Sequence, residues 1–185
     1  MPDDVVDMIM ADHREVERLF NLLETQPDQR TRNLPVLSAL LIAHSRAEES
    51  EVYPVAKDEA GASEKVAHSQ EEHVEAEQIL ERLKAADPTG TEFSRILSEL
   101  VEAVSHHVEE EESSVLPTIR TALPESRRLE LADAFAQSRA EHLGDEPGDA
   151  TKDELLQMAE NVDMSGASTM SKSELDQKLK QQAEQ

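Results

Sequence analysis

Residues 44–54 read HSRAEESEVYP and place polar side chains where an apolar helix face would continue. Leu37 and Leu41 lead into this stretch at helical spacing, and the same spacing continues onto His44 and Glu48. A helix through this stretch places an imidazole and a carboxylate on the face where apolar core residues would be expected to continue. Because residues four apart lie side by side on a helix, the pair presents one nitrogen and one oxygen to a single point.

The same pattern occurs a second time, as HVEEEESSVLP at residues 107–117. Six of the eleven positions are identical, and His107 and Glu111 stand where His44 and Glu48 stand in the first copy. Each residue of the second copy follows its counterpart by 63 positions. The repeat predicts two related helical hairpins that face each other across a pseudo-two-fold axis.

The hydrophobic periodicity is helical along almost the whole chain. Because the connections are short, four long helices predict an up-down-up-down bundle, and a fifth helix follows it directly. Pro54 and Pro117 fall inside the second and fourth helices, where each predicts a kink. The fold class is therefore expected to be all-α, with helices at about residues 4–24, 33–58, 63–86, 91–123 and 124–143.

The composition changes after residue 143. The run GDEPGDA is rich in glycine, proline and aspartate, which predicts a linker. Beyond it, the motifs TKDE and SKSE, which begin at Thr151 and Ser171, have the spacing of capping boxes and predict two short helices. We therefore expect three parts: a bundle domain at residues 1–143, a linker at 144–150 and a small helix–loop–helix module at 151–185.

The composition also limits the classes of function. A formal net charge of −23 repels phosphate backbones, so nucleic-acid binding is not expected, and it favours a monomer. No run of about 18 apolar residues and no secretory leader is present, so neither a membrane span nor export is expected. The lack of cysteine excludes disulfides and thiolate metal sites and agrees with a cytoplasmic location.

Four histidines, one on each long helix, fall on the core-facing stripes, and two glutamates follow one turn later. These candidate ligands are His13, His44, Glu48, His73, His107 and Glu111. An unpaired buried ion costs several kcal/mol, against a total stability of about 5–15 kcal/mol, so a metal is the natural compensation. A single core histidine is most often structural, but the fourfold repetition favours a metal site. Imidazole with carboxylate suits iron, and also manganese or zinc.

The remaining titratable residues near these stripes are assigned to other roles. His68 and His106 lie off the stripes and His142 lies in the fifth helix, so none of the three is expected to be a ligand. The neighbouring acids are interpreted as a solvated helix face: Glu49, Glu51, Glu109, Glu110 and Glu112.

The pattern H…HxxxE…H…HxxxE resembles that of bacterial hemerythrin HHE cation-binding domains over about residues 1–120. All six motif positions are filled, in ADHREV, HSRAEESEVYP, EEHVEAE and HVEEEESSVLP. The resemblance implies two iron ions, Fe2+ or Fe3+, joined by an oxo or hydroxo bridge. It also implies bridging by Glu48 and Glu111, with His13 and His44 mainly on one iron and His73 and His107 on the other. The implied ligands are O2, peroxide or NO, in a response to oxygen, oxidative stress or iron.

One departure from this family changes the expected chemistry. Oxygen-carrying hemerythrins have a fifth histidine one turn after the third ligand, where this chain has Glu77. Glu17 stands in the same relation to His13, and Tyr53, the only tyrosine, lies near the expected centre. Glu77, Glu17 and Tyr53 are either ordinary structural residues or additional ligands. A carboxylate-rich site would stabilise ferric iron and favour redox or peroxide chemistry, including catalase-like decomposition, over reversible oxygen carriage.

A ferritin-like di-iron bundle is the rival architecture for the helical domain. Such bundles use Glu-x-x-His, and none of the 7 histidines has a glutamate three residues before it, which argues against a ferritin-like site.

The last part of the chain has a resemblance of its own. TKDELLQMA and MSKSELDQKL resemble the helix–loop–helix module at the N-terminus of transcription terminator Rho, related to SAP-type modules. Because acids outnumber lysines there, we expect a protein partner for residues 151–185. The alternative function is therefore a metal-responsive switch that acts through this module without catalysis.

Overall fold

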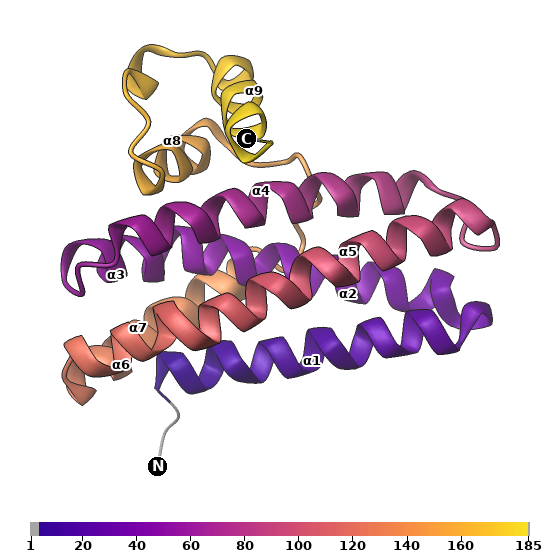
Figure 1. Cartoon of the computed structure of the whole chain (residues 1–185), viewed down its shortest axis with the longest axis horizontal. Helices are drawn as coiled ribbons and strands as arrows, with labels where there is room; N and C mark the ends of the chain where they lie inside the picture. Colours follow the sequence, from indigo (N-terminus) through magenta and orange to yellow (C-terminus); the bar gives the residue numbers. More distant parts are fainter. Residues whose placement is uncertain (1–3, 185) are drawn as a thin grey trace.

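The computed structural model describes residues 4–184, and every regular element in that range is helical (Figure 1). Four antiparallel rods form a bundle, and two of the rods are built from several helical segments. The rods are α1 (Val5–Thr25); α2 (Arg30–Ala47), η2 (Glu48–Val52) and α3 (Tyr53–Asp58); α4 (Ser63–Ala85); and α5 (Thr91–Glu110), η3 (Glu111–Val115) and α6 (Leu116–Ala122). The prediction of an all-α four-helix bundle is confirmed.

The second rod begins earlier than the sequence suggested. A short turn, η1 (Pro27–Gln29), leads directly into Arg30, so α2 starts three residues before the expected position 33. The Arg30 side chain is buried and donates hydrogen bonds to the carbonyls of Leu23 and Pro88, each at 3.0 Å. Its guanidinium also lies over the ring of Phe93. These contacts tie three helix ends together at one end of the bundle.

A wide turn precedes each of the two prolines inside the long rods. η2 and η3 are π-helical turns of 5 residues each, and they end just before the dipeptides that contain Pro54 and Pro117. In the first, the amide of Tyr53 donates to the carbonyl of Glu48, five residues back, and the second copy repeats this bond. Proline has no N–H and its ring crowds the preceding turn, so a wider turn relieves the misfit. The expected kinks therefore take the form of π turns, each beginning at a candidate glutamate ligand.

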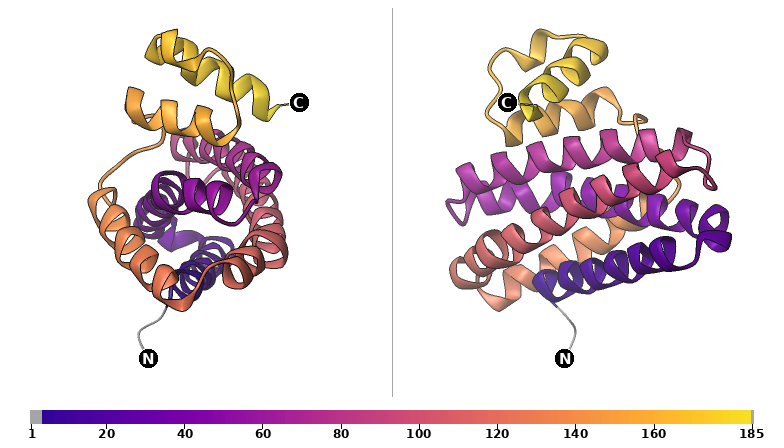
Figure 2. Two further views of the ribbon diagram at one scale, coloured as in Figure 1. Left: turned by 90° about the vertical axis from the view of Figure 1, so that its left-hand side faces the viewer. Right: turned by 45° about the vertical axis from the view of Figure 1, so that its right-hand side comes forward.

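The fifth helix, α7 (Glu125–Glu141), packs along α1 and α2 on the flank of the bundle (Figure 2). Phe135 is fully buried, and its ring lies edge-on to the imidazole of His44 with ring centres 5.8 Å apart. Arg139 pairs with Asp12 of α1. The helix thus closes the side of the bundle where the first two rods carry their histidines.

The C-terminal segment folds as α8 (Lys152–Asn161), η4 (Ala167–Thr169) and α9 (Lys172–Ala183), and it sits on α4 (Figure 1). Both predicted capping boxes are formed, at Thr151 and at Ser171. Leu155 and Leu175 of this segment share an apolar cluster with Val74 of α4. Its core is thus completed by the bundle. The proposed division at residues 144–150 stays a prediction.

The apolar core of the bundle is divided into two clusters. One surrounds Phe20 and Phe93 toward one end, and the other surrounds Tyr53 and Phe135 toward the opposite end. The four candidate histidines lie in the sequence between residues of the first cluster and residues of the second. Within residues 4–184, no helix combines the length and the hydropathy that crossing a bilayer requires.

Candidate metal centre

A layer of buried polar side chains separates the two apolar clusters. It consists of the six residues predicted from the sequence, each at most 6% exposed: His13, His44, Glu48, His73, His107 and Glu111. Two groups of three ligand atoms lie within 4.8 Å of one another, namely those of His13, His44 and Glu48 and those of Glu48, His73 and His107. Glu48 belongs to both groups and therefore lies between them.

Each of the four imidazoles turns its Nε2 atom toward a central carboxylate. His44 (3.2 Å) and His73 (3.4 Å) approach Oε2 of Glu48, and His13 (3.3 Å) and His107 (3.8 Å) approach Oε2 of Glu111. The Nε2 atoms of His73 and His107 are 3.0 Å apart. Nitrogen and oxygen donors from all four rods thus converge on one small volume.

Several atoms of this layer have no hydrogen-bond partner. They are Nε2 of His13, Nε2 of His44, both carboxylate oxygens of Glu48 and Oε2 of Glu111. Buried polar atoms are nearly always hydrogen-bonded, and unpartnered buried charges are strongly destabilising. Nitrogen and oxygen donors with free lone pairs facing one point are the donor set that iron, manganese or zinc takes up. The residues present therefore fit a bound metal cation.

A second set of carboxylates holds the outer nitrogen, Nδ1, of each histidine. These four, which we call the outer carboxylates, are Asp12 on His44 (3.2 Å), Glu49 on His73 (3.2 Å), Glu72 on His107 (2.8 Å) and Glu112 on His13 (2.9 Å). Each carboxylate belongs to a different rod from its histidine, so the contacts run in a ring around the bundle. A carboxylate on Nδ1 fixes the tautomer that leaves Nε2 free for a metal.

The outer carboxylates include two residues that the sequence interpretation placed in solvent. Glu49 is 3% exposed and Glu112 is partly buried, so assigning them to a solvated face was wrong. Asp12 and Glu72 were not singled out at all. The sequence did contain a signal, because each of the four stands next to a candidate ligand: two precede a histidine and two follow a glutamate.

Three of the outer carboxylates are paired with an arginine. Asp12 pairs with Arg139, Glu112 with Arg14, and Glu49 with Arg46 at 2.9 Å. The fourth, Glu72, has no arginine or lysine partner among residues 4–184. Its free oxygen instead faces the side chains of His68 and His106.

The buried charges shift the protonation equilibria of the histidines. Burial by itself lowers the pKa of His44, but the charge of Glu48 and the hydrogen bond to Asp12 raise it to about 10. Burial also lowers the pKa of His73, but hydrogen bonds to Glu48 and Glu49 outweigh this effect and raise the pKa to about 9. Burial tends to raise the pKa of Glu48, yet the charge of His44 holds it well below its usual range. Without metal, therefore, protons occupy part of the layer at neutral pH, and a metal must displace them.

The three additional candidates lie in different places. Tyr53 is buried, and its hydroxyl lies 3.1 Å from Nε2 of His73 and 3.4 Å from Oε1 of Glu111, to which it donates. Burial and the charge of Glu111 raise the pKa of Tyr53 well above its usual value, so the phenol is protonated. Glu77 and Glu17 are not brought to the layer. Glu77 accepts two hydrogen bonds from Arg46, both at 2.8 Å, and Glu17 pairs with Arg14 at the surface.

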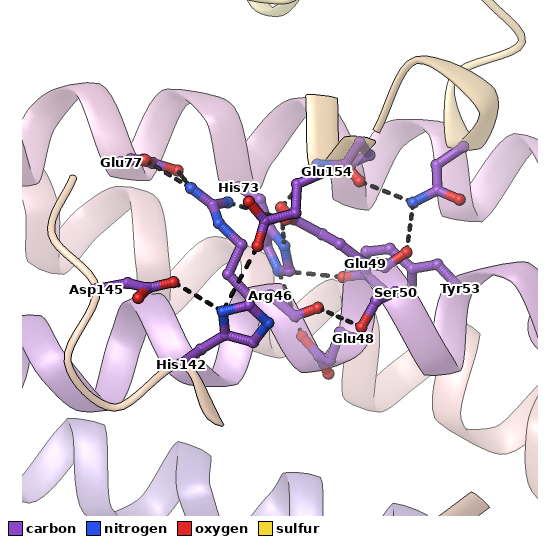
Figure 3. Close-up of polar contacts among 12 residues, drawn as sticks. Arg46, Glu48, Glu49, Ser50, Tyr53, His73, Glu77, His142, Asp145 and Glu154 are labelled. Carbon is purple, nitrogen blue, oxygen red and sulfur yellow. Dashed lines mark hydrogen bonds and ion pairs between the residues drawn. The ribbon is translucent and has the colours of Figure 1, made fainter. Parts of the chain in front are cut away.

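A hydrogen-bonded chain connects this layer to the C-terminal segment. Glu49, which holds His73 (Figure 3), also accepts a hydrogen bond from the side chain of Gln70 at 2.8 Å. The fully buried Asn161 of α8 donates to the carbonyl of Glu49 at 3.0 Å and to Oε1 of Gln70 at 2.9 Å. Arg46 joins the same region through Glu49 and Glu77 (Figure 3). Two side chains, Gln70 and Glu49, thus connect Asn161 to the candidate ligand His73.

A small apolar cavity lies beside the histidines. Valine, leucine and alanine side chains form its walls together with the four imidazoles, and it encloses about 20 Å³. That volume holds roughly one water-sized molecule. The space beside the layer is therefore large enough for one very small molecule.

The three histidines outside the layer lie in two separate groups. His68 and His106 meet Glu72 and Glu110 on the outer side of α4 and α5. His142 pairs with Asp145 at 2.7 Å, near Glu154 of the C-terminal segment (Figure 3). None of the three points into the layer of six.

Comparison with known proteins places this arrangement in a family. The model of the hemerythrin HHE cation binding domain matches residues 4–119. A protein named DNA nickase from Nostoc sp. is 28% identical over 139 residues, which are 74% of this chain but only 39% of that relative. An uncharacterized hemerythrin-like protein of Schizosaccharomyces pombe is 26% identical over 141 residues, which are 73% of this chain and 68% of the relative. No solved structure matches the chain.

The family match contains all six residues of the buried layer and ends before the C-terminal segment. The likeness of that segment to the Rho module therefore stays a prediction. The match extends over more than half of the chain, and the side chains inside it offer free nitrogen and oxygen donors. The chain belongs to the family of hemerythrin HHE cation-binding domains.

Proposed function

We propose that this chain is a non-heme di-iron protein that binds O2, peroxide or NO in a response to oxygen, oxidative stress or iron. The observation that supports this best is the set of buried donor atoms without hydrogen-bond partners. Four imidazoles and two carboxylates are more donors than one tetrahedral ion takes, and Glu48 lies in both three-ligand groups. A pair of ions shared by the glutamates accounts for both facts.

The side chains have distinct roles in this proposal. Glu48 and Glu111 would be shared by the two ions, His13 and His44 would hold one of them, and His73 and His107 would hold the other. The outer carboxylates keep each Nδ1 protonated, so that each Nε2 lone pair points inward. Bound iron would supply the redox chemistry, because two neighbouring ions can exchange two electrons with one small molecule. The apolar walls of the cavity exclude bulk water and limit access to small ligands.

An enzymatic version of this function is the decomposition of peroxide. Two molecules of H2O2 would give one O2 and two H2O, so oxygen evolution measures it directly. We expect His44→Ala to abolish it, because His44 lies in one of the three-ligand groups. Glu109→Ala is the control, because this exposed side chain lies on the same rod as His107 but outside the buried layer. If iron-loaded protein evolves no oxygen, the chain binds its ligand without this catalysis.

The first test of the proposal is metal content. Protein expressed with iron and purified in air should contain two irons per chain, and His44→Ala should contain fewer. Metal that binds only the folded state raises the melting temperature by mass action, so chelation should lower it. An unchanged melting temperature with no bound metal would mean that the six side chains are structural, and the proposal would be wrong.

A second candidate function is a metal-responsive switch that acts through residues 151–185. The chain of contacts from His73 through Glu49 and Gln70 to Asn161 favours it. Removing the metal would then loosen α8 and α9, which faster amide hydrogen exchange in these helices would show. Asn161→Ala should make that exchange equally fast with and without metal. If the amide exchange rates in α8 and α9 of the wild-type chain are the same with and without metal, the switch is contradicted.

The similarity to the Nostoc relative does not support a role on DNA for this chain. The matched residues are 39% of that relative, and a net charge of −23 opposes contact with a phosphate backbone. A cytoplasmic location, a monomeric state and a protein partner for the C-terminal segment remain predictions.

A further inference from the structure

Glu72 is the exception in the ring of outer carboxylates. Three members of that ring have one oxygen on a histidine and a guanidinium nearby. Glu72 places Oε2 on Nδ1 of His107, while its Oε1 is buried and makes no hydrogen bond. The Glu72 side chain is only 10% exposed. Glu72 is therefore the one outer carboxylate whose second oxygen has no guanidinium nearby among residues 4–184.

The side chains around that oxygen can hold a cation. His68 and Glu72 are one turn apart on α4, and His106 and Glu110 are one turn apart on α5. Each pair presents a nitrogen and an oxygen on the same helix face. One ligand atom from each of the four residues lies within 4.8 Å of all the others. We call these four residues the surface cluster.

The separations within the surface cluster match a tetrahedral ion. His68 Nε2 lies 2.9 Å from a Glu110 oxygen and 3.4 Å from Oε1 of Glu72. His106 Nε2 lies 3.4 Å from the other Glu110 oxygen and 3.7 Å from Oε1 of Glu72. A tetrahedron with metal–ligand bonds of about 2.1 Å has edges of about 3.4 Å. Two neutral imidazoles with two carboxylates carry a net charge that one divalent ion neutralises.

The surrounding surface guides a cation to this position. A groove between α4 and α5 is lined by Glu72, Glu75, Glu102 and His106 among others, so one wall of the surface cluster opens onto it. A groove lined by one sign of charge raises the local concentration of the opposite ion. His68 is 53% and His106 61% exposed, so their nitrogens can be reached from solvent.

We propose that the surface cluster is a second metal site, separate from the buried layer, that binds one divalent transition-metal cation, with zinc as the ion that its geometry suits. The cation takes the place that arginine holds at the other three outer carboxylates. It binds Oε1 of Glu72 while Oε2 stays on His107, so the surface site and the buried layer share one carboxylate. The alternative is that these histidines and glutamates contact one another at the surface and bind no metal.

Metal analysis of the full chain tests the proposal. Iron-loaded protein is dialysed against Zn2+, and iron and zinc per chain are both measured for the wild type and for the double variant His68→Ala, His106→Ala. The wild type should take up one zinc per chain more than the double variant at equal iron content. His142→Ala, which removes a histidine of the other surface group, is the matched control and should keep that zinc.

The outcomes separate the two metal sites. Iron content reports on the buried layer, and the zinc difference reports on the surface cluster, so a chain that fails to bind iron still gives a result for zinc. Equal zinc uptake by the wild type and the double variant would overturn the proposal. Both histidines are more than half exposed, so the double variant should fold, which its far-UV circular dichroism checks.

Discussion

The protonation state of the buried layer predicts an unusual pH dependence for the metal-free protein. His44 has a folded-state pKa of about 10, against an ordinary value of 6.5. A raised pKa means that the folded state binds the proton more tightly than the unfolded state does. The protonated His44 therefore adds to the free energy of unfolding, fully below pH 6.5, and this addition is lost as the pH rises through about 10. Between pH 6.5 and pH 9 the loss for His44 alone is about 3 kcal/mol. His73 acts in the same direction, but it shares Glu48, so its contribution is not simply added.

This loss is large enough to measure by thermal unfolding. For a chain of this size, 1 kcal/mol corresponds to about 2–4 °C, so the melting temperature of chelated protein should fall by about 6–12 °C between pH 6.5 and pH 9. Glu48→Gln removes the charge that raises the pKa of His44 most, so the same variant without metal should show a smaller fall. General surface titration affects both proteins alike and cancels in the comparison. Equal falls in the wild type and in Glu48→Gln would refute the reasoning.

Bound metal should cancel this loss of stability at high pH. Ions compete with protons for the same Nε2 atoms, so raising the pH strengthens metal binding. Iron-loaded protein should therefore keep its melting temperature between pH 6.5 and pH 9 while the chelated protein loses stability. Parallel curves for the two forms would contradict a shared set of nitrogen atoms.

Three further predictions concern single side chains. Tyr53→Phe should keep the iron content and shift the visible absorption of the iron-loaded protein, because the hydroxyl lies 3.1 Å from His73; an unchanged spectrum would place Tyr53 outside the centre. Asn161→Ala should lose about 1–3 kcal/mol of local stability, seen as faster hydrogen exchange in α8 and α9, since a buried amide with three hydrogen bonds is removed; Glu160→Ala, an exposed position on the same helix, is its control. Phe135→Ala should cost about 3–5 kcal/mol in urea unfolding because the ring is fully buried against His44, and a cost under 1 kcal/mol would show that α7 is not needed to close the bundle.

The features that the sequence predicted correctly are local ones. Helix type, the short connections and the two capping boxes depend on residues a few positions apart, and the structure contains all of them. The inward direction of His13, His44, His73 and His107 follows from the same periodicity, because each continues a stripe of buried apolar residues. Such features can be read from one chain without knowledge of what lies opposite.

The features that the sequence missed depend on contacts between helices. Glu49 and Glu51 are both acids in one acidic run, yet only Glu49 is buried, because Arg46, Gln70 and His73 surround it. Periodicity cannot distinguish the members of such a run, since Gln70 and His73 lie on another rod. The docking of α8 and α9 on the bundle was missed for the same reason, as Asn161 finds partners on η2 and α4.

The two π turns also determine how this chain tolerates changes in length. Glu48, Val52 and Ala56 are each four residues apart, and all three are buried. In a regular α-helix, side chains four residues apart move gradually around the axis, whereas a wider turn keeps them on one face. The amide of Tyr53 bonds the carbonyl of Glu48 five residues back, so deleting Ser50 would turn this contact into the ordinary four-residue helix bond and leave Tyr53 beside His73. A deletion in the regular helix between Leu37 and His44 has no such turn to absorb it and would rotate His44 by about 100° relative to the residues before the deletion. Single deletions should therefore be tolerated inside η2 and η3 and rejected in the regular helix that leads to each histidine.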